Sequence, residues 1–265
     1  MTAPALNIRQ LSVDLGPAGE RRTVVDSVSF ELRRGEVLAL VGESGCGKSK
    51  AAEAIMGLLP RGSSRVRAER IRLGEHDLKE LSPRAMRKLC GRDISMVFQE
   101  PRAALDPVFR VGQQVSSVFR RHRGLSGSKA RNASAEMLLR VGFAEPGRVM
   151  RAYPHELSGG MCQRIGIAMA MACRPQVLIA DEPTSALDVT TQAQVLAQLI
   201  RSCRREDTAV LLITHDLGVV AQYSERALVM RQGKIVEEAS VAELFTRPRN
   251  EYTRSLLAMA QAGMA

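Results

Sequence analysis

The segment Gly42-Glu-Ser-Gly-Cys-Gly-Lys48-Ser49 decides the fold of this 265-residue chain. It fits the pattern G-x-x-x-x-G-K-[ST], in which glycines allow backbone N–H groups to converge on phosphate oxygens. The apolar run Val37–Val41 just before it predicts a buried strand, and residues 48–59 just after it predict a helix. Because a helix N-terminus adds positive potential, this strand–loop–helix arrangement predicts a phosphate-binding site.

The groups in this loop suggest separate roles in binding a nucleotide. The ammonium of Lys48 is expected to reach the β- and γ-phosphates, and the Ser49 hydroxyl is expected to hold Mg²⁺. Lys50 has two open interpretations, since it either adds charge near the phosphates or points into solvent or toward a neighbouring subdomain. The predicted nucleotide contacts of the segment are Gly42, Ser44, Gly45, Cys46, Gly47, Lys48, Ser49 and Lys50.

Two more apolar runs end in polar side chains. Val177–Ala180 leads into Asp181 and Glu182, and Val210–Thr214 leads into His215. Predicted helices alternate with these strands at residues 163–173 and 190–204. This alternation predicts a parallel sheet with helices on both faces, in which ligands bind beyond the carboxyl ends of the strands.

Four polar residues near strand ends are candidates for catalysis and metal binding. Asp181 suits a carboxylate that orients Mg²⁺, and Glu182 suits a general base for the attacking water or a residue that positions it. His215 can donate a hydrogen bond to the γ-phosphate and so sense its presence. Gln99 follows the short predicted strand Ser95–Phe98 and can contact Mg²⁺ or the water. The predicted metal ligands are Ser49, Gln99 and Asp181.

A second phosphate cradle is predicted further along the chain. Leu157–Met161 opens the helix that contains Gln163, so N–H groups at the helix start lie beside the Ser158 hydroxyl. The predicted contacts here are Ser158, Gly159 and Gly160. One chain then carries two partial phosphate sites. If these sites belong to opposite ends of the molecule, two subunits must face head to tail to complete each one.

The remaining segments surround this core. Alternating apolar residues between residues 6 and 32 predict an antiparallel β-section. Residues 101–159 have a helical pattern, broken by turns at 124–127 and 146–147, which predicts a helical insertion. The predicted nucleotide-binding core comprises residues 1–100 and 160–235, and residues 236–265 are predicted to form a C-terminal tail.

Composition argues against several classes of protein. The five cysteines are odd in number and contain no C-x-x-C pair, which disfavours a disulfide framework or a structural zinc site. No apolar run reaches the roughly 18 residues of a membrane helix, so another chain would have to supply any pore. The net charge of +10 lies in the first half of the chain and fits phosphates, an anionic membrane surface or nucleic acid. Aromatic residues make up only 3% of the chain, which disfavours stacking on bases.

Taken together, these segments resemble the ABC ATPase family over nearly the whole chain. The six matching motifs are Walker A at Gly42–Ser49, the Q-loop at Gln99, the signature at Leu157–Met161, Walker B with its catalytic glutamate at Val177–Glu182, the D-loop with Asp188, and the switch histidine His215. The resemblance implies an α/β P-loop NTPase fold, with a RecA-like parallel sheet core, an antiparallel β-section and an inserted helical subdomain. It also implies that the chain binds ATP and Mg²⁺ and hydrolyses ATP, with Asp188 at the nucleotide site.

The resemblance implies partners as well. A second ABC ATPase subunit, identical or homologous, would complete a head-to-tail dimer. Two transmembrane permease subunits and a periplasmic or extracellular solute-binding protein would complete an importer, and no nucleic acid is expected. The chain would then lie peripherally on the cytoplasmic face of the inner membrane.

Finer wording is similar to the peptide and nickel importer subfamily, for example Phe98-Gln-Glu-Pro and Tyr252-Thr-Arg-Ser-Leu-Leu. No cysteine follows Cys203, which makes the chain more similar to the shorter nickel-type subunit than to the peptide type. The predicted function is ATP-driven uptake of nickel, a nickel chelate, or di- and oligopeptides. The alternatives are an exporter ATPase or a soluble ABC ATPase that acts on nucleic acid or the ribosome.

Three residues depart from the family pattern. Leu15 stands where the family usually stacks an aromatic side chain on adenine, so stacking of roughly 1–3 kcal/mol would be lost. Met161 ends the signature where Gln is commoner, and Lys50 replaces a residue that is usually uncharged. Weaker or less base-selective nucleotide binding is therefore expected.

Overall fold

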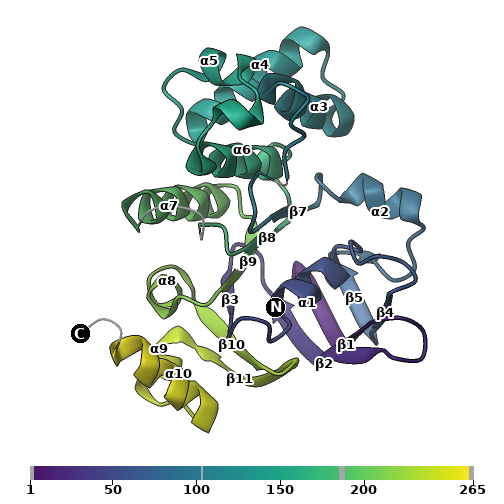
Figure 1. Ribbon diagram of the computed structural model, residues 1–265, viewed down its shortest axis with the longest axis vertical. Helices are drawn as coiled ribbons and strands as arrows, with labels where there is room; N and C mark the ends of the chain where they lie inside the picture. The colour runs from purple at the N-terminus through teal and green to yellow at the C-terminus, as the bar shows by residue number, and fades with distance from the viewer. Residues whose placement is uncertain (1–2, 103, 185–188, 263–265) are drawn as a thin grey trace. The chain divides into compact units, whose positions relative to one another are not determined.

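The computed structural model describes residues 3–102, 104–184 and 189–262. The chain forms two compact units, one made of residues 1–86 and 209–265 and the other of residues 87–208. Each unit has its own strands and helices (Figure 1). Among the described residues, no helix combines the length and the apolar character that crossing a membrane requires.

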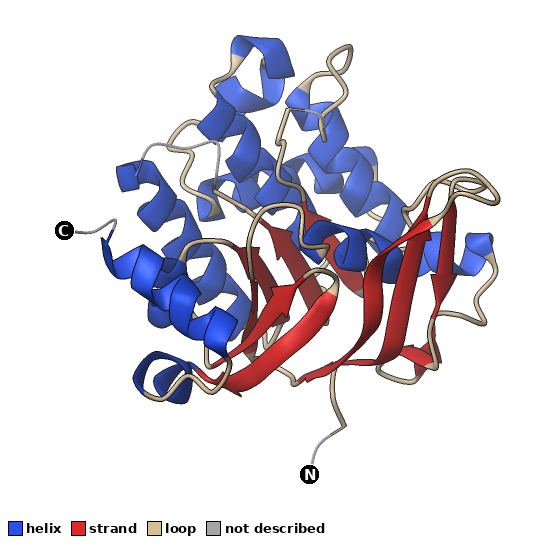
Figure 2. Cartoon of the chain, turned by 60° about the horizontal axis from the view of Figure 1, so that its bottom comes forward, coloured by secondary structure: helices blue, strands red, loops and turns tan. Residues whose placement is uncertain are grey.

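The first unit contains an antiparallel sheet, which confirms the β-section predicted from the alternation near the N-terminus (Figure 2). Apolar side chains at alternate positions are buried along much of its central strand, as expected for a pleated strand with one face in the core. The strands of this sheet are β1 (Leu6–Leu15), β2 (Arg22–Leu32), β4 (Ser64–Arg67), β5 (Arg70–Leu73) and β6 (His76–Asp77). β1 pairs with β2, β4 and β5, and β6 pairs with β5.

The first unit also contains the strands that carry the phosphate loop, three of them parallel and β11 antiparallel. The strands, in spatial order, are β11 (Lys234–Ser240), β10 (Arg226–Arg231), β3 (Val37–Val41) and β9 (Ala209–Thr214). β3 runs parallel to both β10 and β9, and every residue of β3 and β9 is buried. Continuous apolar runs of this kind are typical of strands covered on both faces.

Four helices belong to the first unit, and α2 (Pro83–Leu89) crosses the boundary between the units. The four are α1 (Lys48–Ile55), α8 (Leu217–Tyr223), α9 (Val241–Thr246) and α10 (Glu251–Ala262). The sequence predicted that the helix after the phosphate loop would run to residue 59, but α1 ends at Ile55. Gly57 has φ +66° and the Leu58 N–H bonds to the Glu53 carbonyl, a glycine-terminated helix end that the sequence pattern did not reveal.

In its described residues, the second unit contains two parallel strands and five α-helices. Its elements are β7 (Ile94–Val97), β8 (Val177–Asp181), α3 (Val111–Arg123), α4 (Gly127–Arg140), α5 (Pro146–Arg151), the 3-10 turn η1 (Pro154–Glu156), α6 (Gly159–Met171) and α7 (Val189–Arg205). The predicted turns coincide with the end of α3 at Gly124 and the start of α5 at Pro146. The unit boundary differs from the predicted domain limits, because β7, α6, β8 and α7 share one compact unit with α3–α5.

The C-terminal residues predicted as a tail pack against the parallel strands of the first unit. β11 pairs antiparallel with β10, and the helices α9 and α10 follow it. Leu244, Tyr252 and Leu257 are buried in a core cluster with Val41 of β3 and Val229 of β10. The tail is therefore part of the folded core of this unit.

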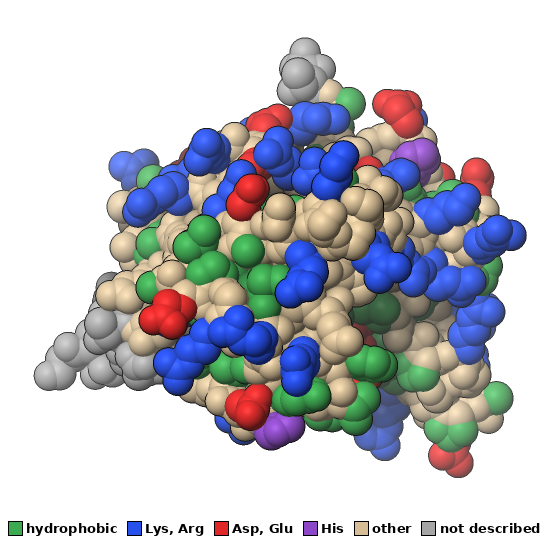
Figure 3. Space-filling view, turned by 90° about the horizontal axis from the view of Figure 1, so that it is seen from above, with side chains coloured by type: hydrophobic (Ala, Val, Ile, Leu, Met, Phe, Trp, Pro, Cys, Tyr) green, Lys and Arg blue, Asp and Glu red, His purple; other side chains and the backbone are tan. Residues whose placement is uncertain are grey.

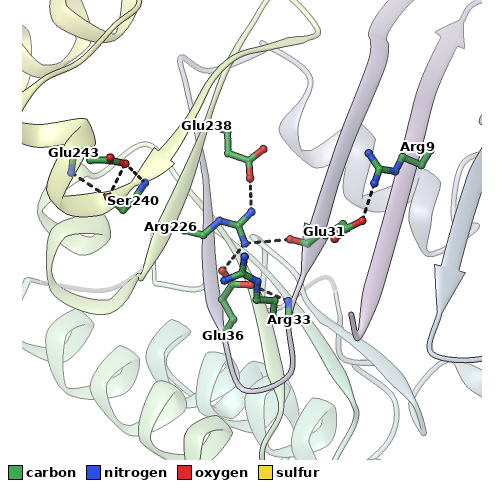
Figure 4. Close-up of polar contacts among 8 residues, drawn as sticks. All are labelled: Arg9, Glu31, Arg33, Glu36, Arg226, Glu238, Ser240 and Glu243. Carbon is green, nitrogen blue, oxygen red and sulfur yellow. Dashed lines mark hydrogen bonds and ion pairs between the residues drawn. The ribbon is translucent and has the colours of Figure 1, made fainter. Parts of the chain in front are cut away.

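Arg226 of β10 is the centre of an ion-pair cluster in the first unit (Figure 4). Its Nη1 lies 2.6 Å from Glu36 Oε1, and its Nη2 pairs with Glu238. The second oxygen of Glu36 accepts the Arg33 N–H at 2.8 Å. Because Glu36 is 8% exposed and a buried charge is costly unless it is paired, the cluster joins the turn before β3 to β10 and β11.

All five cysteines carry free thiols, in agreement with the expectation of no disulfide framework. Burial, with a smaller effect of Glu206, raises the pKa of Cys203 to about 12. Burial also raises the pKa values of Cys90, Cys162 and Cys173. These four thiols are therefore poor nucleophiles at neutral pH.

Candidate nucleotide-binding site

The predicted phosphate loop connects β3 to α1 in the first unit. Gly42 has φ +156° and Gly47 has φ +112°, conformations that favour glycine. A Cβ at Gly42 would lie 2.1 Å from the Met230 carbonyl oxygen, and one at Gly47 would lie 2.4 Å from the Val24 carbonyl oxygen. The loop therefore passes so close to β10 and β2 that no side chain fits. At Gly45, by contrast, a Cβ would meet nothing within 4 Å, so this part of the loop is open to a ligand.

Lys48 is buried inside the loop to which it belongs. The residue is only 5% exposed, and its ammonium donates to the Gly42 carbonyl at 2.7 Å and to the Glu43 carbonyl at 2.8 Å. Cys46 is also buried, and its carbonyl accepts the Gly233 N–H at 2.8 Å. The loop and its lysine are thus held in place by backbone contacts of this unit.

The other predicted loop residues differ in exposure. Ser44 and Gly45 are exposed, and Ser49 is half-buried in the first turn of α1. Lys50 forms an ion pair with Glu53 along the same helix, with 2.7 Å between Nζ and Oε1. The structure therefore places its charge beside an acidic neighbour, rather than leaving it unpaired in solvent.

His215 lies next to the phosphate loop because of strand register. In the parallel pair of β3 and β9, Val41 is opposite Thr214, so Gly42 and His215 are the next residues at the same sheet edge. His215 is exposed, and Asp216 caps α8 by accepting the Gly218 N–H at 2.8 Å. The prediction that the histidine and the loop share one edge agrees with this geometry.

The same register argument brings two candidate residues together in the second unit. In the parallel pair of β7 and β8, Val97 is opposite Ala180, which places residue 99 beside residue 182. The Gln99 amide donates to Glu182 Oε2 at 3.0 Å. Sequence reasoning named both residues but missed their direct bond, which the register of two adjacent strands could have indicated.

Glu182 has an uncommon backbone conformation. It follows Asp181, the buried last residue of β8, and has φ +43°. A non-glycine residue at positive φ is rare, and such residues occur often at functional sites. The conformation turns the chain sharply at the end of β8, and the turn itself carries the predicted base.

The second predicted cradle is the start of α6. Ser158 is the N-cap residue, and its hydroxyl accepts the Met161 N–H at 3.2 Å. Ser158 is exposed, and Gly159 and Gly160 are half-buried. An uncovered helix start presents N–H groups and the positive end of the helix dipole, which together suit an anion.

Arg102 is a site residue that the sequence did not indicate. Its Nη2 donates to the Leu157 carbonyl at 3.2 Å, immediately before the α6 start. The segment that follows Gln99 is thus bonded to the segment that carries Ser158. Asp188, the remaining predicted contact, lies outside the described residues.

Comparisons with known proteins agree with these motifs. The family described as "ABC transporter" matches residues 25–185. The dipeptide transport ATP-binding protein DppD of Bacillus subtilis is 48% identical over 252 residues, which are 95% of this chain and 75% of that protein. The peptidoglycan transport ATP-binding protein YejF of Agrobacterium fabrum is 47% identical over 99% of this chain, but the chain spans only 48% of its length. The glutathione import ATP-binding protein GsiA of Pectobacterium atrosepticum is 47% identical, and the chain covers 42% of it.

Solved structures are similar to this chain over most of its length. A dimeric post-hydrolysis structure of the ATP-binding cassette MJ0796, bound to ADP and Pi, has a TM-score of 0.79 and 25% sequence identity. The match covers 89% of this chain and 98% of that one. The similarity extends over nearly the whole of that cassette, which is dimeric and binds nucleotide.

Proposed function

This chain belongs to the ABC transporter family, and from that premise we propose that it is the ATP-hydrolysing subunit of an importer of peptides. Membership of the family makes it an ATP-binding ATPase. The observation that carries the proposal is the pair of partial phosphate sites. The first is the glycine loop around buried Lys48, and the second is the uncovered start of α6 at Ser158.

The loop residues would bind the triphosphate. The loop is open at Gly45, and Lys48 lies in the loop interior, where it could neutralise β- and γ-oxygens. Ser49, Gln99 and Asp181 offer a hydroxyl, an amide and a carboxylate oxygen, a donor set that suits Mg²⁺. When bound, Mg²⁺ would neutralise charge that develops on the transferred phosphoryl group.

Glu182 would act on the attacking water. Its carboxylate accepts the water proton as the water oxygen bonds to the γ-phosphorus, and the bond to the ADP oxygen breaks. The bond from Gln99 orients that carboxylate at 3.0 Å. His215, at the edge shared with Gly42, would donate a hydrogen bond to the γ-phosphate.

A second subunit would complete each site. Ser158 and the first amides of α6 would bind the γ-phosphate held by the loop of the partner. Charge-assisted hydrogen bonds contribute about 1.5–3 kcal/mol each, and about 5.5 kcal/mol drives a nearly complete shift from open to closed. The MJ0796 cassettes are described as dimeric, which supports the dimer in this proposal.

The helical elements of the second unit offer a surface for membrane subunits. A groove of about 830 Å³ over α3, α4 and α5 is lined by Arg110, Arg120, Arg131 and Arg151, and none of the four has an acidic partner in the described part of the chain. Figure 3 shows that basic side chains are plentiful on the face that carries these helices. Val108 and Phe109 nearby in sequence are 70% and 50% exposed. A mixed basic and apolar surface suits an acidic amphipathic segment of a permease.

Peptides are the cargo class that the comparisons favour. The relatives reported above are named for transport of dipeptides, peptidoglycan and glutathione, all of which contain peptide bonds. Nickel, the other predicted cargo, is named in none of the relatives reported above. Two permeases, a solute-binding protein and a place on the cytoplasmic face of the inner membrane complete the proposal.

The decisive experiment is Glu182→Gln in the complete transporter. Hydrolysis should fall by about 10²–10⁴-fold, because the base is lost, while ATP binding and the closed dimer persist. The matched control is Glu136→Gln, an exposed glutamate of α4 in the same unit. Size-exclusion chromatography with light scattering would report the dimer. Normal ATP hydrolysis by Glu182→Gln would show that Glu182 is not the base. Dipeptide uptake that does not depend on ATP would contradict the proposal of an ATP-driven importer.

A further inference from the structure

We propose that Tyr252, on the C-terminal helix α10, is a positioning residue for the phosphate loop. Its hydroxyl accepts the backbone N–H of Glu43 at 3.2 Å, a contact between residues 209 positions apart in sequence. Both residues belong to the first unit. The proposal rests on the proposed function, since it concerns the nucleotide affinity of the same loop.

Glu43 is the residue through which Tyr252 can act on Lys48. The Glu43 N–H bonds to Tyr252, and the Glu43 carbonyl accepts Lys48 Nζ at 2.8 Å. The next carbonyl toward the strand, that of Gly42, accepts the same ammonium at 2.7 Å. The hydroxyl of Tyr252 therefore fixes one end of the residue whose other end holds the lysine.

Tyr252 itself is held firmly. The ring is 6% exposed, and the guanidinium of Arg231 lies 4.8 Å from its centroid. The Tyr252 N–H bonds to the side chain of Asn250 at 2.9 Å, and the Asn250 N–H bonds to the Glu237 carboxylate at 3.0 Å. Hydrogen bonds through Asn250 thus anchor the start of α10 to Glu237 of β11, which holds the Tyr252 hydroxyl near Glu43.

Packing alone would not require the hydroxyl. A phenylalanine would fill the same apolar space in the cluster with Leu257 and Val41. A tyrosine buried with its oxygen on a loop amide satisfies a donor that water would otherwise have to reach. Burial raises the pKa of Tyr252 above its ordinary value, so the hydroxyl stays protonated at physiological pH and accepts the Glu43 N–H through an oxygen lone pair.

The test is Tyr252→Phe in the full-length chain, measured in two ways. Hydrogen–deuterium exchange without nucleotide should show faster exchange of the Glu43 amide, by about three- to tenfold, because the N–H loses its acceptor. The KM and the dissociation constant for MgATP should rise by about three- to tenfold, the range expected for one hydrogen bond, with kcat within about twofold. Unchanged exchange together with an unchanged KM would overturn the proposal.

Leu257→Val is the matched control. Leu257 is 7% exposed on the same helix, and its truncation loosens α10 without removing the bond to the loop. The control should leave Glu43 exchange and KM as they are in the wild type. If it raised the KM as much as Tyr252→Phe, α10 would act through general stability and the positioning role would be wrong. Because exchange is measured without ATP, a wild type that failed to hydrolyse ATP would overturn the proposed function and leave the exchange measurement as a test of the Tyr252 contact.

Discussion

Single residues at the ends of parallel strands explain most of the candidate site. The pairs Gly42 with His215 and Gln99 with Glu182 each follow opposed residues of neighbouring strands. In each pair, register alone fixes the neighbourhood, because side chains that extend past the same sheet edge meet. The sequence could therefore predict which of these residues lie at the same sheet edge. It could not predict the Arg102 bond to Leu157, since nothing in the pattern marks a lone arginine as a partner of a backbone carbonyl.

The residue Leu15 leads to a prediction about the base of the nucleotide. Leu15 is half-buried at the end of β1, and an aliphatic side chain does not stack on adenine as an aromatic ring does. The wild type should bind ATP and GTP with affinities within about threefold of each other. Leu15→Tyr should tighten ATP binding by about five- to a hundredfold, the equivalent of about 1–3 kcal/mol of stacking.

Fluorescent-nucleotide competition would measure these affinities. Leu58→Tyr is the control, because Leu58 is an exposed leucine of the same unit at 47% exposure. A wild type that strongly prefers ATP would show that another surface recognises adenine.

Among the elements, the C-terminal segment is the one whose importance the sequence concealed. Local patterns predicted the strand–loop–helix of the phosphate loop and the helices of the insertion, because periodicity and turn residues are local signals. The packing of α10 against the phosphate loop depends on the meeting of two segments far apart in the chain. The length of α1 also deviated from the prediction, because a glycine cap at Gly57 ends the helix early.

The anchor of that segment predicts a dependence of stability on pH. Burial raises the pKa of the Glu237 carboxyl, but backbone N–H bonds from Arg249 and Asn250 outweigh it, so the folded-state pKa lies below the ordinary value. The stabilisation is therefore fully present above about pH 4.3 and is lost as the pH falls through the lower, folded-state pKa.

Thermal unfolding followed by circular dichroism would reveal this contribution. Glu237→Gln should destabilise the protein by about 1–3 kcal/mol at pH 7, since it weakens two hydrogen bonds to a charged acceptor. The difference between wild type and variant should shrink below about pH 4. A gap that stayed constant from pH 7 to pH 3.5 would mean that the charge of Glu237 does not anchor the segment.

At the scale of the whole molecule, the two partial sites predict complementation between defective chains. A Lys48→Ala chain lacks a working loop but retains Ser158, and a Ser158→Arg chain has the reverse defect. Each variant alone should show background ATPase activity. An equimolar mixture should recover roughly a quarter of wild-type activity, because half of randomly formed twofold dimers contain one complete site of two.

Steady-state phosphate release would measure the recovery. The control mixes Lys48→Ala with the double variant Lys48→Ala/Ser158→Arg, which can form no complete site. Recovery in the control, or none in the test mixture, would contradict the head-to-tail arrangement.

The contacts of Lys48 with its own loop have a kinetic consequence. The residue is buried, and its ammonium donates to two carbonyls of its own loop. The loop is therefore preorganised for a triphosphate, and binding requires little conformational change. The rate at which ATP replaces ADP should then equal the rate at which the two subunits of the dimer separate. The rate of transport would therefore be set by dimer opening and nucleotide binding.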